Sequence, residues 1–390
     1  MKLLFVLTPA FNPNNGGVQR TTYKLGKHFT EKGIEVTYFS TAFSGHIDVE
    51  FGKLYHGPEK GGCSNKRNLK YLLTVLGQIE PDIVINQMPY EAELRSVLSA
   101  NRSTIGYILL GCLRNSLFSF KSNARDIVRT MYHPLLFKAI DNPLALGLIQ
   151  RNHRRTHARD LRRILDDHDK FILLTPKNND ELSFFVGDYK KEKVLSIPNS
   201  IPEVFQQFSQ KEKIILYVGR LNVQQKKADI ILPVWERIYK QLPEWKLIII
   251  GDGPFMENMK ARIESNKLER VSLTGYQKPE SYYKDAAIFL MPSAYEGFPN
   301  VIIEAQSFGL VPVAFDSYAS VSWIVNNEKD AFLLPPYKID PMADAVLKLA
   351  SDPVLLEEMS NNAFENANRF TIDNVGAIWL ELFKNMGKYP

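Results

Sequence analysis

Residues 288–309 have the sequence IFLMPSAYEGFPNVIIEAQSFG, and this stretch contains the clearest indication of the fold. Its first part, 288–293, is an apolar run of strand length. Its last part, 301–308, repeats apolar residues at helical spacing and stops at Gly309. Pro299 suits the first helical position, because its missing N–H would be unpaired there anyway. The stretch therefore predicts a strand, a loop and a helix in that order.

Two glutamates eight positions apart enclose the loop of this stretch. We expect Glu296 in the loop and Glu304 in an early turn of the helix, with free backbone N–H groups near 297–301 facing the loop. A helix start of this kind attracts phosphate, and carboxylates accept hydrogen bonds from sugar hydroxyls. The pattern indicates a nucleotide-sugar site. By itself it equally fits a helix with an acidic N-terminus, where glutamate stabilises the helix dipole.

Continuous apolar runs separated by helical stretches recur along the whole chain. This rhythm predicts parallel sheets covered by helices on both faces, and hence an α/β protein. Because the runs form two series, we expect two doubly wound, Rossmann-like domains facing each other across a cleft, with ligands at the carboxyl ends of the strands. The expected strands are 2–8, 35–40, 82–87, 104–109, 171–175 and 194–197, followed by 214–218, 247–250, 271–274, 288–291, 311–315 and 332–334.

The length of 390 residues exceeds that of one ordinary domain core. The proline-containing segment 198–202 and the polar segment 206–212 separate the two series of strands, and we interpret them as the linker. Helical spacing returns at the end of the chain, in 353–370 and 371–386. The expected parts are an N-terminal domain of residues 1–198, a C-terminal domain of residues 199–370 and a last helical segment, 371–390.

Composition indicates an ordinary globular protein, with 45% hydrophobic and 23% charged residues. The two cysteines, Cys63 and Cys112, do not form a disulfide framework or a metal-ligand pattern, which favours a reducing compartment. The polar segment 12–17 interrupts the first apolar run too early for a signal peptide. No apolar stretch approaches the roughly 18 to 20 residues that a spanning helix requires. We therefore expect a cytoplasmic protein.

The net charge of +5 is unevenly distributed. Six arginines crowd residues 151–163 beside a single acid, Asp160, and four of them share one face of a helix that follows the apolar segment 135–149. Such a segment can rest on anionic lipid, at the inner face of the cell membrane; a solvated basic helix is an equal alternative. Nucleic acid is not expected, because no recognition motif accompanies the charge. The possible membrane contacts are Arg151, Arg154, Arg155, Arg159, Arg162 and Arg163.

Three other loops at strand ends carry groups that suit a phosphate ligand. Arg220 and Lys226 follow the strand 214–218, and an arginine and a lysine there can converge on a diphosphate. Gly251-Asp252-Gly253 permits a tight turn and close approach to a ligand, and Gly16-Gly17 frees backbone N–H groups at a helix start. Solvated surface loops and structural turns are the alternatives for each motif alone.

In their order along the chain, these motifs resemble glycosyltransferase family 4, whose members retain the anomeric configuration and have the GT-B fold. The resemblance covers nearly the whole chain, is strongest over 217–316 and is weak over 52–163, the region that would hold the acceptor. It departs from the family at Lys227, where a glycine is frequent, so Lys227 is a second candidate for the role of the lysine, alone or shared with Lys226. It also departs at 111–115, which contains no histidine although several members have histidine or aspartate near the reacting sugar.

The resemblance implies a role for each matching residue. Glu296 would contact the transferred sugar, Glu304 would hold the ribose, and Arg220 and Lys226 would neutralise the departing diphosphate. The last helix would cross back to the N-terminal, acceptor-binding domain, while the C-terminal domain binds the donor. The implied donor-binding residues are Gly16, Gly17, Gly251, Asp252, Gly253, Tyr276, Gly297, Phe298, Pro299, Asn300, Val301 and Glu304.

The resemblance thus implies a retaining hexosyltransferase that uses a nucleotide diphosphate sugar, typically a UDP-sugar, and an acceptor hydroxyl on a glycan or lipid-linked molecule of a bacterial surface polysaccharide. No cofactor is expected, and no metal, since two cations can replace a divalent ion at the diphosphate. Three other classes remain open from the residues alone: a glycosidase using the two glutamates, a sugar-nucleotide epimerase, and a noncatalytic nucleotide-sugar binding protein. The arginine and lysine pair argues against the glycosidase.

Overall fold

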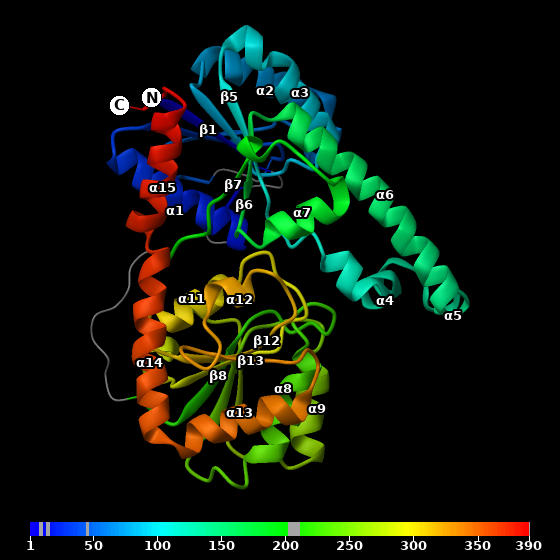
Figure 1. Ribbon diagram of the computed structural model, residues 1–390, viewed down its shortest axis with the longest axis vertical. Coiled ribbons are helices and arrows are strands. Elements are labelled where there is room, and N and C mark those ends of the chain that lie inside the picture. Colours follow the sequence, from blue (N-terminus) through cyan, green and yellow to red (C-terminus); the bar gives the residue numbers. More distant parts are fainter. Residues whose placement is uncertain (8–10, 13–15, 44–46, 202–210, 390) are drawn as a thin grey trace. The chain divides into compact units, whose positions relative to one another are not determined.

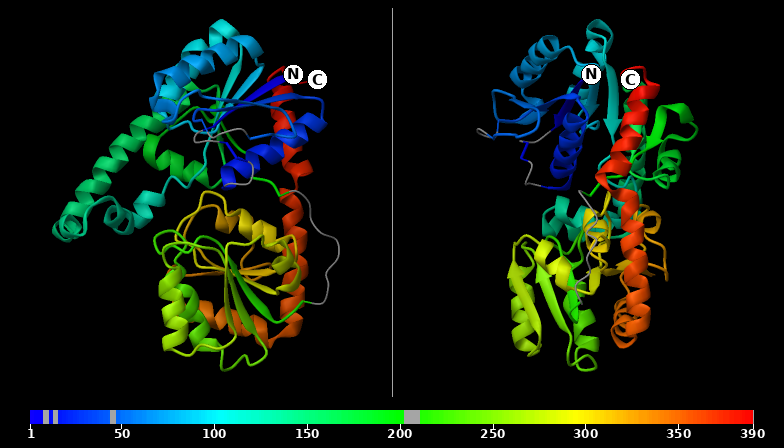
Figure 2. Two further views of the ribbon diagram at one scale, coloured as in Figure 1. Left: turned by 180° about the vertical axis from the view of Figure 1, so that it is seen from behind. Right: turned by 90° about the vertical axis from the view of Figure 1, so that its left-hand side faces the viewer.

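A computed structural model describes residues 1–7, 11–12, 16–43, 47–201 and 211–389 (Figure 1). The chain forms two compact units. The first comprises Met1–Leu117, Gly147–Pro202 and Ile372–Pro390, and the second comprises Phe118–Leu146 and Glu203–Thr371. In each unit a parallel sheet has helices on both faces (Figures 1 and 2).

The first unit contains a seven-stranded parallel sheet with strand order β3-β2-β1-β4-β5-β6-β7. Its inner strands are short and almost wholly buried, as expected of a sheet covered on both faces. The strands are β1 (Lys2–Leu7), β2 (Glu35–Ser40), β3 (Lys53–His56), β4 (Ile83–Asn86), β5 (Ile108–Cys112), β6 (Lys170–Leu173) and β7 (Val194–Ser196). The helices that begin and end in this unit are α1 (Gly17–Glu31), α2 (Lys66–Ile79), α3 (Ala92–Ile105), α7 (Asn178–Val186) and α15 (Ile372–Asn385).

Two hydrophobic clusters cover the faces of this sheet. On one face α1 and α15 pack together, with Phe29 and Phe383 in edge-on contact at a centroid distance of 5.4 Å. Gly376 of α15 lies against His28 of α1, where even a Cβ atom would approach the imidazole to 2.3 Å. On the other face α2 and α3 contribute the buried side chains. The chain therefore completes the first unit with its last helix.

The second unit contains a six-stranded parallel sheet with strand order β10-β9-β8-β11-β12-β13. The strands are β8 (Ile214–Val218), β9 (Lys246–Ile250), β10 (Val271–Gly275), β11 (Ile288–Met291), β12 (Val311–Phe315) and β13 (Phe332–Leu334). The helices are α4 (Ser119–Met131), α5 (Pro134–Ile140), α8 (Ala228–Ile238), α9 (Met256–Ser265), α10 (Glu280–Asp285), α11 (Asn300–Gln306), α12 (Val321–Ile324), α13 (Ile339–Ser351) and α14 (Pro353–Ala367). Helix α6 (Pro143–Asp167) starts in this unit and continues into the first, and short 3-10 turns lie at Gly62–Ser64, Lys191–Lys193 and Asn368–Phe370.

The residues 118–146 group with the second unit, whereas the expected division left them in the N-terminal domain. Two contacts hold helix α4 to this unit. The Lys227 amino group lies 2.7 Å from Asp126 Oδ2, and the Tyr337 hydroxyl donates to Asn123 Oδ1 at 2.8 Å. No periodicity in the sequence predicts such polar contacts between distant segments. Half of the expected linker, residue 202 and residues 206–210, lies outside the described residues.

Three other expectations need correction. The strand expected at 104–109 begins only at Ile108, because α3 continues to Ile105. Strand β3 was not expected, since its half-exposed residues lack a continuous apolar run. Helix α11 begins at Asn300, so Pro299 occupies the preceding cap position rather than the first helical one. The Asn300 N–H already bonds to Phe298 O, closing a turn before the helix starts.

Candidate active site

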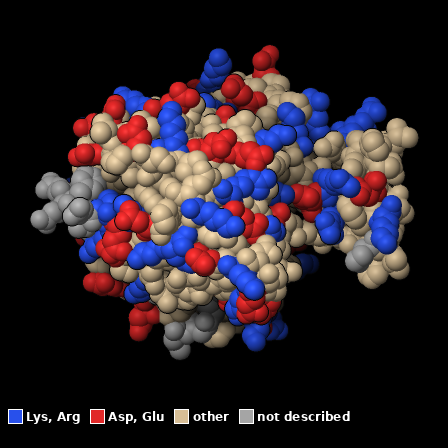
Figure 3. Space-filling model, turned by 90° about the horizontal axis from the view of Figure 1, so that it is seen from below, with Lys and Arg blue, Asp and Glu red and all other residues tan. Residues whose placement is uncertain are grey.

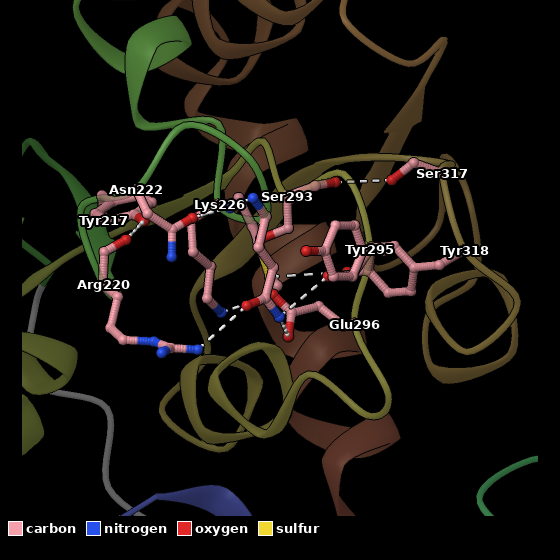
Figure 4. A network of polar contacts seen from close by, with 11 residues as sticks. Tyr217, Arg220, Asn222, Lys226, Ser293, Tyr295, Glu296, Ser317 and Tyr318 are labelled. Atoms are coloured by element: carbon pink, nitrogen blue, oxygen red, sulfur yellow. Dashed lines mark hydrogen bonds and ion pairs between the residues drawn. The ribbon is translucent and has the colours of Figure 1, made fainter. Parts of the chain in front are cut away.

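The loops that follow β8 and β11 bring Lys226 and Glu296 into direct contact. Lys226 Nζ lies 2.6 Å from Glu296 Oε1, and the two side chains are only 13% and 10% exposed (Figure 4). An ion pair this shielded interacts more strongly than a surface pair, because little water screens it. The sequence motifs therefore meet in space at one loop cluster, which we call the 220–296 cluster: Arg220, Asn222, Gln225, Lys226 and Glu296.

Gln225 joins the two loops of the 220–296 cluster. Its Nε2 donates to Glu296 Oε2 at 3.2 Å and to the Tyr295 carbonyl at 3.3 Å, while its backbone carbonyl accepts from Ala294 N at 2.7 Å. On the other side, Gln225 Oε1 accepts from Arg220 Nη2 at 3.2 Å. Gln225 thus holds the carboxylate and the guanidinium in one network, a role that sequence analysis did not assign.

Asn222 gives the first loop its shape. Its side-chain oxygen accepts the backbone N–H groups of Gln225 and Lys226 at 3.1 and 2.9 Å, and its carbonyl accepts Ala228 N at 3.1 Å. Asparagine commonly folds its own backbone in this way. The turn directs the Lys226 side chain to Glu296. An asparagine directly after Gly-Arg-Leu is a signal that the sequence did contain.

The adjacent lysines have different partners. Lys227 adopts a left-handed backbone conformation with φ of 48° and pairs with Asp126 of α4, and its amino group lies 5.1 Å from the centre of the Tyr337 ring. Lys226 instead pairs with Glu296. Lys226, and not Lys227, therefore belongs to the network that runs through Glu296 and Gln225 to Arg220.

Burial determines the protonation of the tyrosines around Glu296. Burial raises the pKa of Tyr295 and Tyr318, and the nearby Glu296 carboxylate raises both further. Burial likewise raises the pKa of Tyr217, whose hydroxyl donates to the Arg220 carbonyl at 3.1 Å. These hydroxyls therefore stay protonated at neutral pH and act as hydrogen-bond donors or packing groups around the carboxylate.

The glycines of Gly251-Asp252-Gly253 are required by packing within the protein. A Cβ atom on Gly251 would lie 1.8 Å from the Gly219 carbonyl oxygen, and one on Gly253 would lie 2.5 Å from the Leu221 carbonyl oxygen. Their φ angles of 147° and 156° also disfavour other residues. The close approach that sequence analysis expected toward a ligand is made here to the loop that carries Arg220.

The loop before α11 is mostly buried. Phe298 is 8% exposed and packs edge-on against Phe370, with ring centres 5.9 Å apart, so its side chain serves the core. Gly297 and Pro299 are also buried, whereas Asn300 and Val301 are partly exposed. Glu304 is partly exposed on α11, and its carboxylate makes no hydrogen bond or ion pair with any other described residue.

A buried polar network holds the C-terminal end of α11 in place. Gln306 donates to Asp330 Oδ1 at 3.2 Å and accepts from Asn366 Nδ2 at 3.1 Å. Asp330 is 1% exposed, and burial raises its pKa although Asn326 donates two hydrogen bonds to it. The network holds Glu304 and its helix in one orientation, and the spacing of these residues in sequence gives no hint of it.

The remaining predicted donor-binding residues are Asp252 and Tyr276 in the second unit and Gly16 and Gly17 in the first. Tyr276, just after β10, is 80% exposed, and Asp252 is exposed as well. Gly16 and Gly17 belong to the first unit, where Gly16 has a φ of 69° at the start of α1 and a Cβ atom there would meet nothing within 4 Å. The conformation alone explains glycine at this position. The neighbouring Asn14 and Asn15 of this motif lie outside the described residues.

The six arginines of 151–163 all lie on α6 and are all exposed. Arg154 stacks on Phe184 at 4.2 Å and donates to its carbonyl, and Arg162 donates to the Val186 carbonyl at 3.4 Å. Leu144 and Leu148, on the same helix, are 82% and 67% exposed. Of the helices in the described ranges, none has the length and apolarity to cross a membrane. On the face shown in Figure 3, Lys and Arg are interspersed with Asp and Glu.

The strand end at 111–115 contains no histidine, but His168, the residue after α6, lies beside it. His168 is fully buried beside Gly111, where a Cβ atom would approach its ring to 2.9 Å. Its Nδ1 lies 2.8 Å from the Ile164 carbonyl and therefore donates, which leaves Nε2 to accept from Asn86 Nδ2 at 3.2 Å. Burial lowers the pKa of His168 to about 4, so the ring is neutral. It packs inside the first unit and is a structural residue.

Comparison with known proteins supports this description of the second unit. Residues 201–366 match the model of a family described as glycosyl transferases group 1. Curated relatives include an exopolysaccharide phosphotransferase of Streptomyces coelicolor, 25% identical over 99% of this chain and 41% of that protein, and an uncharacterized glycosyltransferase of Haemophilus influenzae, 30% identical over 54% and 60%. A poly(ribitol-phosphate) alpha-N-acetylglucosaminyltransferase of Staphylococcus aureus is 29% identical over 51% and 41%. The chain thus spans about two fifths to three fifths of the length of these relatives.

Solved structures share the fold at low sequence identity. TarM matches with a TM-score of 0.73 over 98% of both chains at 16% identity, and sucrose-phosphate synthase from Thermosynechococcus elongatus matches with a TM-score of 0.74 over 99% and 98% at 17% identity. The chain therefore has the GT-B fold. The segment that matches the glycosyl transferases group 1 model, residues 201–366, contains the 220–296 cluster.

Proposed function

We propose that this chain is a retaining glycosyltransferase that moves a hexosyl group from a nucleotide diphosphate sugar, a UDP-sugar, to an acceptor hydroxyl. The observation that carries the proposal is the contact of Lys226 with Glu296 and their link through Gln225 to Arg220, within the segment that matches the glycosyl transferases group 1 model. The cluster combines a carboxylate that suits sugar hydroxyls with two cations that suit a diphosphate.

The chemistry of sugar transfer explains why both signs of charge are needed. Breaking the bond between sugar and diphosphate leaves positive charge on the sugar ring and negative charge on the departing diphosphate. Arg220 is exposed and forms no ion pair with any other described residue, so its guanidinium is available to a bidentate phosphate contact. Preorganised charges of this kind stabilise the transition state without reorganisation during the reaction.

Glu296 has a positioning role in this proposal. Its carboxylate is held by Lys226 and Gln225, so a bound sugar would meet an oriented acceptor of hydrogen bonds. When a diphosphate attracts the Lys226 amino group, the carboxylate becomes free to accept from the sugar. A diphosphate oxygen would then take the proton of the acceptor hydroxyl, which keeps charge balanced as the new glycosidic bond forms. Glu304 would hold the ribose with its unpaired carboxylate.

Relatives suggest the class of acceptor. Their names specify poly(ribitol-phosphate), poly(glycerol-phosphate) and diphosphoundecaprenol acceptors, as well as amylovoran biosynthesis. We propose that the acceptor here is likewise a glycan or lipid-linked molecule of a bacterial surface polymer, one that carries phosphate. The phosphotransferase relative is matched over only 41% of its length, so its name does not assign phosphate transfer to this segment.

The decisive experiment is a panel of nucleotide sugars incubated with the full chain and candidate acceptors. Release of the nucleoside diphosphate together with a new glycoside supports transfer, and the anomeric coupling of the product by NMR tests retention. An altered nucleotide sugar without release would instead identify an epimerase. Donor binding without turnover would identify a sensor. Activity that persists after EDTA treatment would support the proposed metal independence, whereas loss restored by Mg²⁺ or Mn²⁺ would contradict it.

We further propose that α6 rests on anionic lipid at the inner face of the membrane. Leu144, Leu148, Arg151 and Arg155 follow at spacings of four, three and four residues, so the exposed leucines continue into the arginine face. Apolar residues beside cationic ones suit the boundary between acyl chains and anionic head groups. This arrangement would bring a lipid-linked acceptor to the enzyme.

Liposome flotation tests the membrane proposal. The chain should float with vesicles containing anionic phosphatidylglycerol and much less with neutral phosphatidylcholine vesicles. Replacing Arg151 and Arg155 by Glu should abolish the difference, while the same charge change at the exposed Lys240 and Lys284 should not. Equal flotation on both kinds of vesicle, or no effect of the arginine variant, would remove the charge argument.

A further inference from the structure

Arg114 occupies the carboxyl edge of the first unit's sheet, two residues after β5. Its Nη2 donates to Gln87 Oε1, directly after β4, and its Nη1 donates to Asn199 Oδ1 at 3.3 Å, shortly after β7. Three strand ends therefore place their first polar side chains around one guanidinium. In doubly wound sheets this edge is where ligands bind.

The surroundings of this guanidinium are neutral. Within the described part of the chain no carboxylate forms an ion pair with Arg114, and its neighbours are two amide oxygens and the Cys112 thiol. Burial raises the pKa of Cys112, so the thiol carries no compensating charge, and burial also lowers the pKa of Arg114. A shielded cation without a counterion is costly, which makes such an arrangement unusual unless something else supplies the charge.

Arg95 in the same unit shows the usual solution. It is 3% exposed, and its Nε donates to Asp167 Oδ2 at 2.8 Å while Nη1 donates to the Pro89 carbonyl at 2.7 Å. The Arg95 guanidinium is thus neutralised inside the protein. Arg114 is partly exposed and lacks such an acid, which leaves its charge available to an anion that binds from outside.

The same cluster also holds buried donors without acceptors. Among the described residues, Arg114 Nε and Gln87 Nε2 have no hydrogen-bond partner. Gln87 is 1% exposed. Buried donors are almost always satisfied in folded proteins, so each unpaired group points to a missing acceptor. An anion with several oxygen atoms is the ligand that would satisfy an arginine and an amide together.

We propose that Arg114, with Gln87, forms a binding site for a phosphate group, and that this phosphate belongs to the acceptor. The assignment to the acceptor rests on the proposed function; the anion site itself does not. A free phosphate or the donor diphosphate would present the same oxygen atoms, and the experiment separates these sources. The 111–115 segment contains no histidine, and under this proposal it contributes Arg114 to the binding of the phosphate group.

Phosphate binding to the full chain is measured by isothermal titration calorimetry with inorganic phosphate and with glycerol 3-phosphate, and glycerol serves as the uncharged probe. The titrations use the variant Arg220→Ala with Lys226→Ala, which lacks the two donor-side cations. This variant should still bind both phosphates and should not bind glycerol. Adding Arg114→Gln should weaken binding by about 10- to 100-fold, as expected for loss of a charge-assisted hydrogen bond. Loss of binding in the donor-side variant itself would assign the phosphate to the donor and overturn the proposal.

Three further variants control for folding and charge. Arg114→Lys should restore part of the binding, and Arg67→Gln, at an exposed arginine of α2, should leave it unchanged. Gln87→Glu places a carboxylate against Arg114, so the protein should melt no lower than the parent while phosphate binding is lost. Undiminished binding by either the Arg114→Gln or the Gln87→Glu chain would overturn the site.

Kinetics then tests the acceptor assignment. With a transferring donor, Arg114→Gln should raise KM for a phosphate-bearing acceptor by about 10-fold or more relative to its phosphate-free analogue. An equal rise for both acceptors would overturn the assignment to acceptor phosphate. If no donor supports transfer by the unmodified chain, the proposed function fails, whereas the calorimetric result on the anion site stands by itself.

Discussion

At the carboxyl edge of the second unit's sheet Lys226 is paired with Glu296, whereas at the same edge of the first unit's sheet Arg114 contacts only neutral groups among the described residues. Both cations are largely shielded from water, and both stand in loops that follow parallel strands. The difference lies in when each charge receives its counterion. Lys226 has one within the protein, and under our proposals Arg114 receives one from a ligand.

The contrast shows that an ion-pair partner within the protein changes how a cation responds to an anionic ligand. Lys226 must exchange Glu296 for a diphosphate, so the free energy of the ion pair opposes donor binding while it keeps both groups oriented. Arg114 has no ion-pair partner among the described residues, so an anion that reaches it displaces no internal counterion. An internal ion pair, as at Lys226, suits a cation that must be held in a defined position for the reaction. A cation without a counterion, as at Arg114, suits simple binding of an anion.

The largest effect is expected when the cationic side of the 220–296 cluster is removed. Arg220→Ala with Lys226→Ala should lower kcat by roughly 1,000-fold or more, because each preorganised charge is worth about 100- to 1,000-fold in comparable sites. The variant should remain folded, since Gln225 still donates to Glu296. Activity assays with circular dichroism check both statements. A folded and active double variant would contradict the diphosphate role.

Glu296→Gln makes the two sites more alike, because Lys226 would then lie beside a neutral amide, as Arg114 lies beside the amides of Gln87 and Asn199. Turnover should fall by about 100-fold, while nucleotide affinity stays close to that of the unmodified chain or rises slightly. The reason is that the variant loses the group that orients the sugar but keeps both phosphate-binding cations. Turnover kinetics combined with calorimetry of the nucleoside diphosphate measures the two effects. Near-normal turnover would exclude Glu296 from the sugar site.

The adjacent lysines give a matched pair with a smaller effect. Lys227→Ala should change kcat by only about threefold, because its amino group is already neutralised by Asp126 of α4. Lys226→Ala should reduce kcat by about 100-fold. Steady-state kinetics of both variants under the same conditions provides the comparison. Equal losses would show that both lysines serve the diphosphate.

A prediction of another kind is a dependence of stability on pH that originates in the first unit. Burial lowers the pKa of His168 and of His157 to about 4 each, below the value of about 6.5 in an unfolded chain. The unfolded state therefore binds more protons between pH 6.5 and 4. Stability should fall as pH falls through this window, by up to about 1.4 kcal/mol per pH unit for each histidine. Denaturant unfolding at pH 7, 6 and 5 measures the slope, and a slope near zero would contradict it.

The fold was largely predictable from the sequence, for a simple reason. Buried parallel strands are continuous apolar runs, so β8, β11, β12 and β13 were predicted with the bounds that the structure shows. Strand β3 was missed because it lies at the edge of the sheet and is half exposed. The strand expected at 104–109 overlapped the end of α3, because apolar residues both end that helix at Ile105 and begin β5 at Ile108.

The site was predictable only where its motif is local. Glu296, Arg220 and Lys226 could be named from short spacings, and the structure brings them into one network through Gln225. Asp126 could not be named, since it is 101 residues from Lys227 in sequence. Likewise Arg114 stood in a segment singled out only for the histidine it lacks. Its neutral surroundings come from three separate strand ends, which spacing along the chain does not reveal.

The chain crosses between the two units at residues 117, 146, 202 and 371, and this has a consequence for biosynthesis. Helix α15 packs on α1 at Phe29 and His28, so the apolar face of α1 stays uncovered until the ribosome has released residues 372–385. The second unit has all of its strands earlier. We therefore expect the second unit to fold before the first during synthesis. We also expect fragments cut near residue 198 to aggregate rather than to fold as separate proteins.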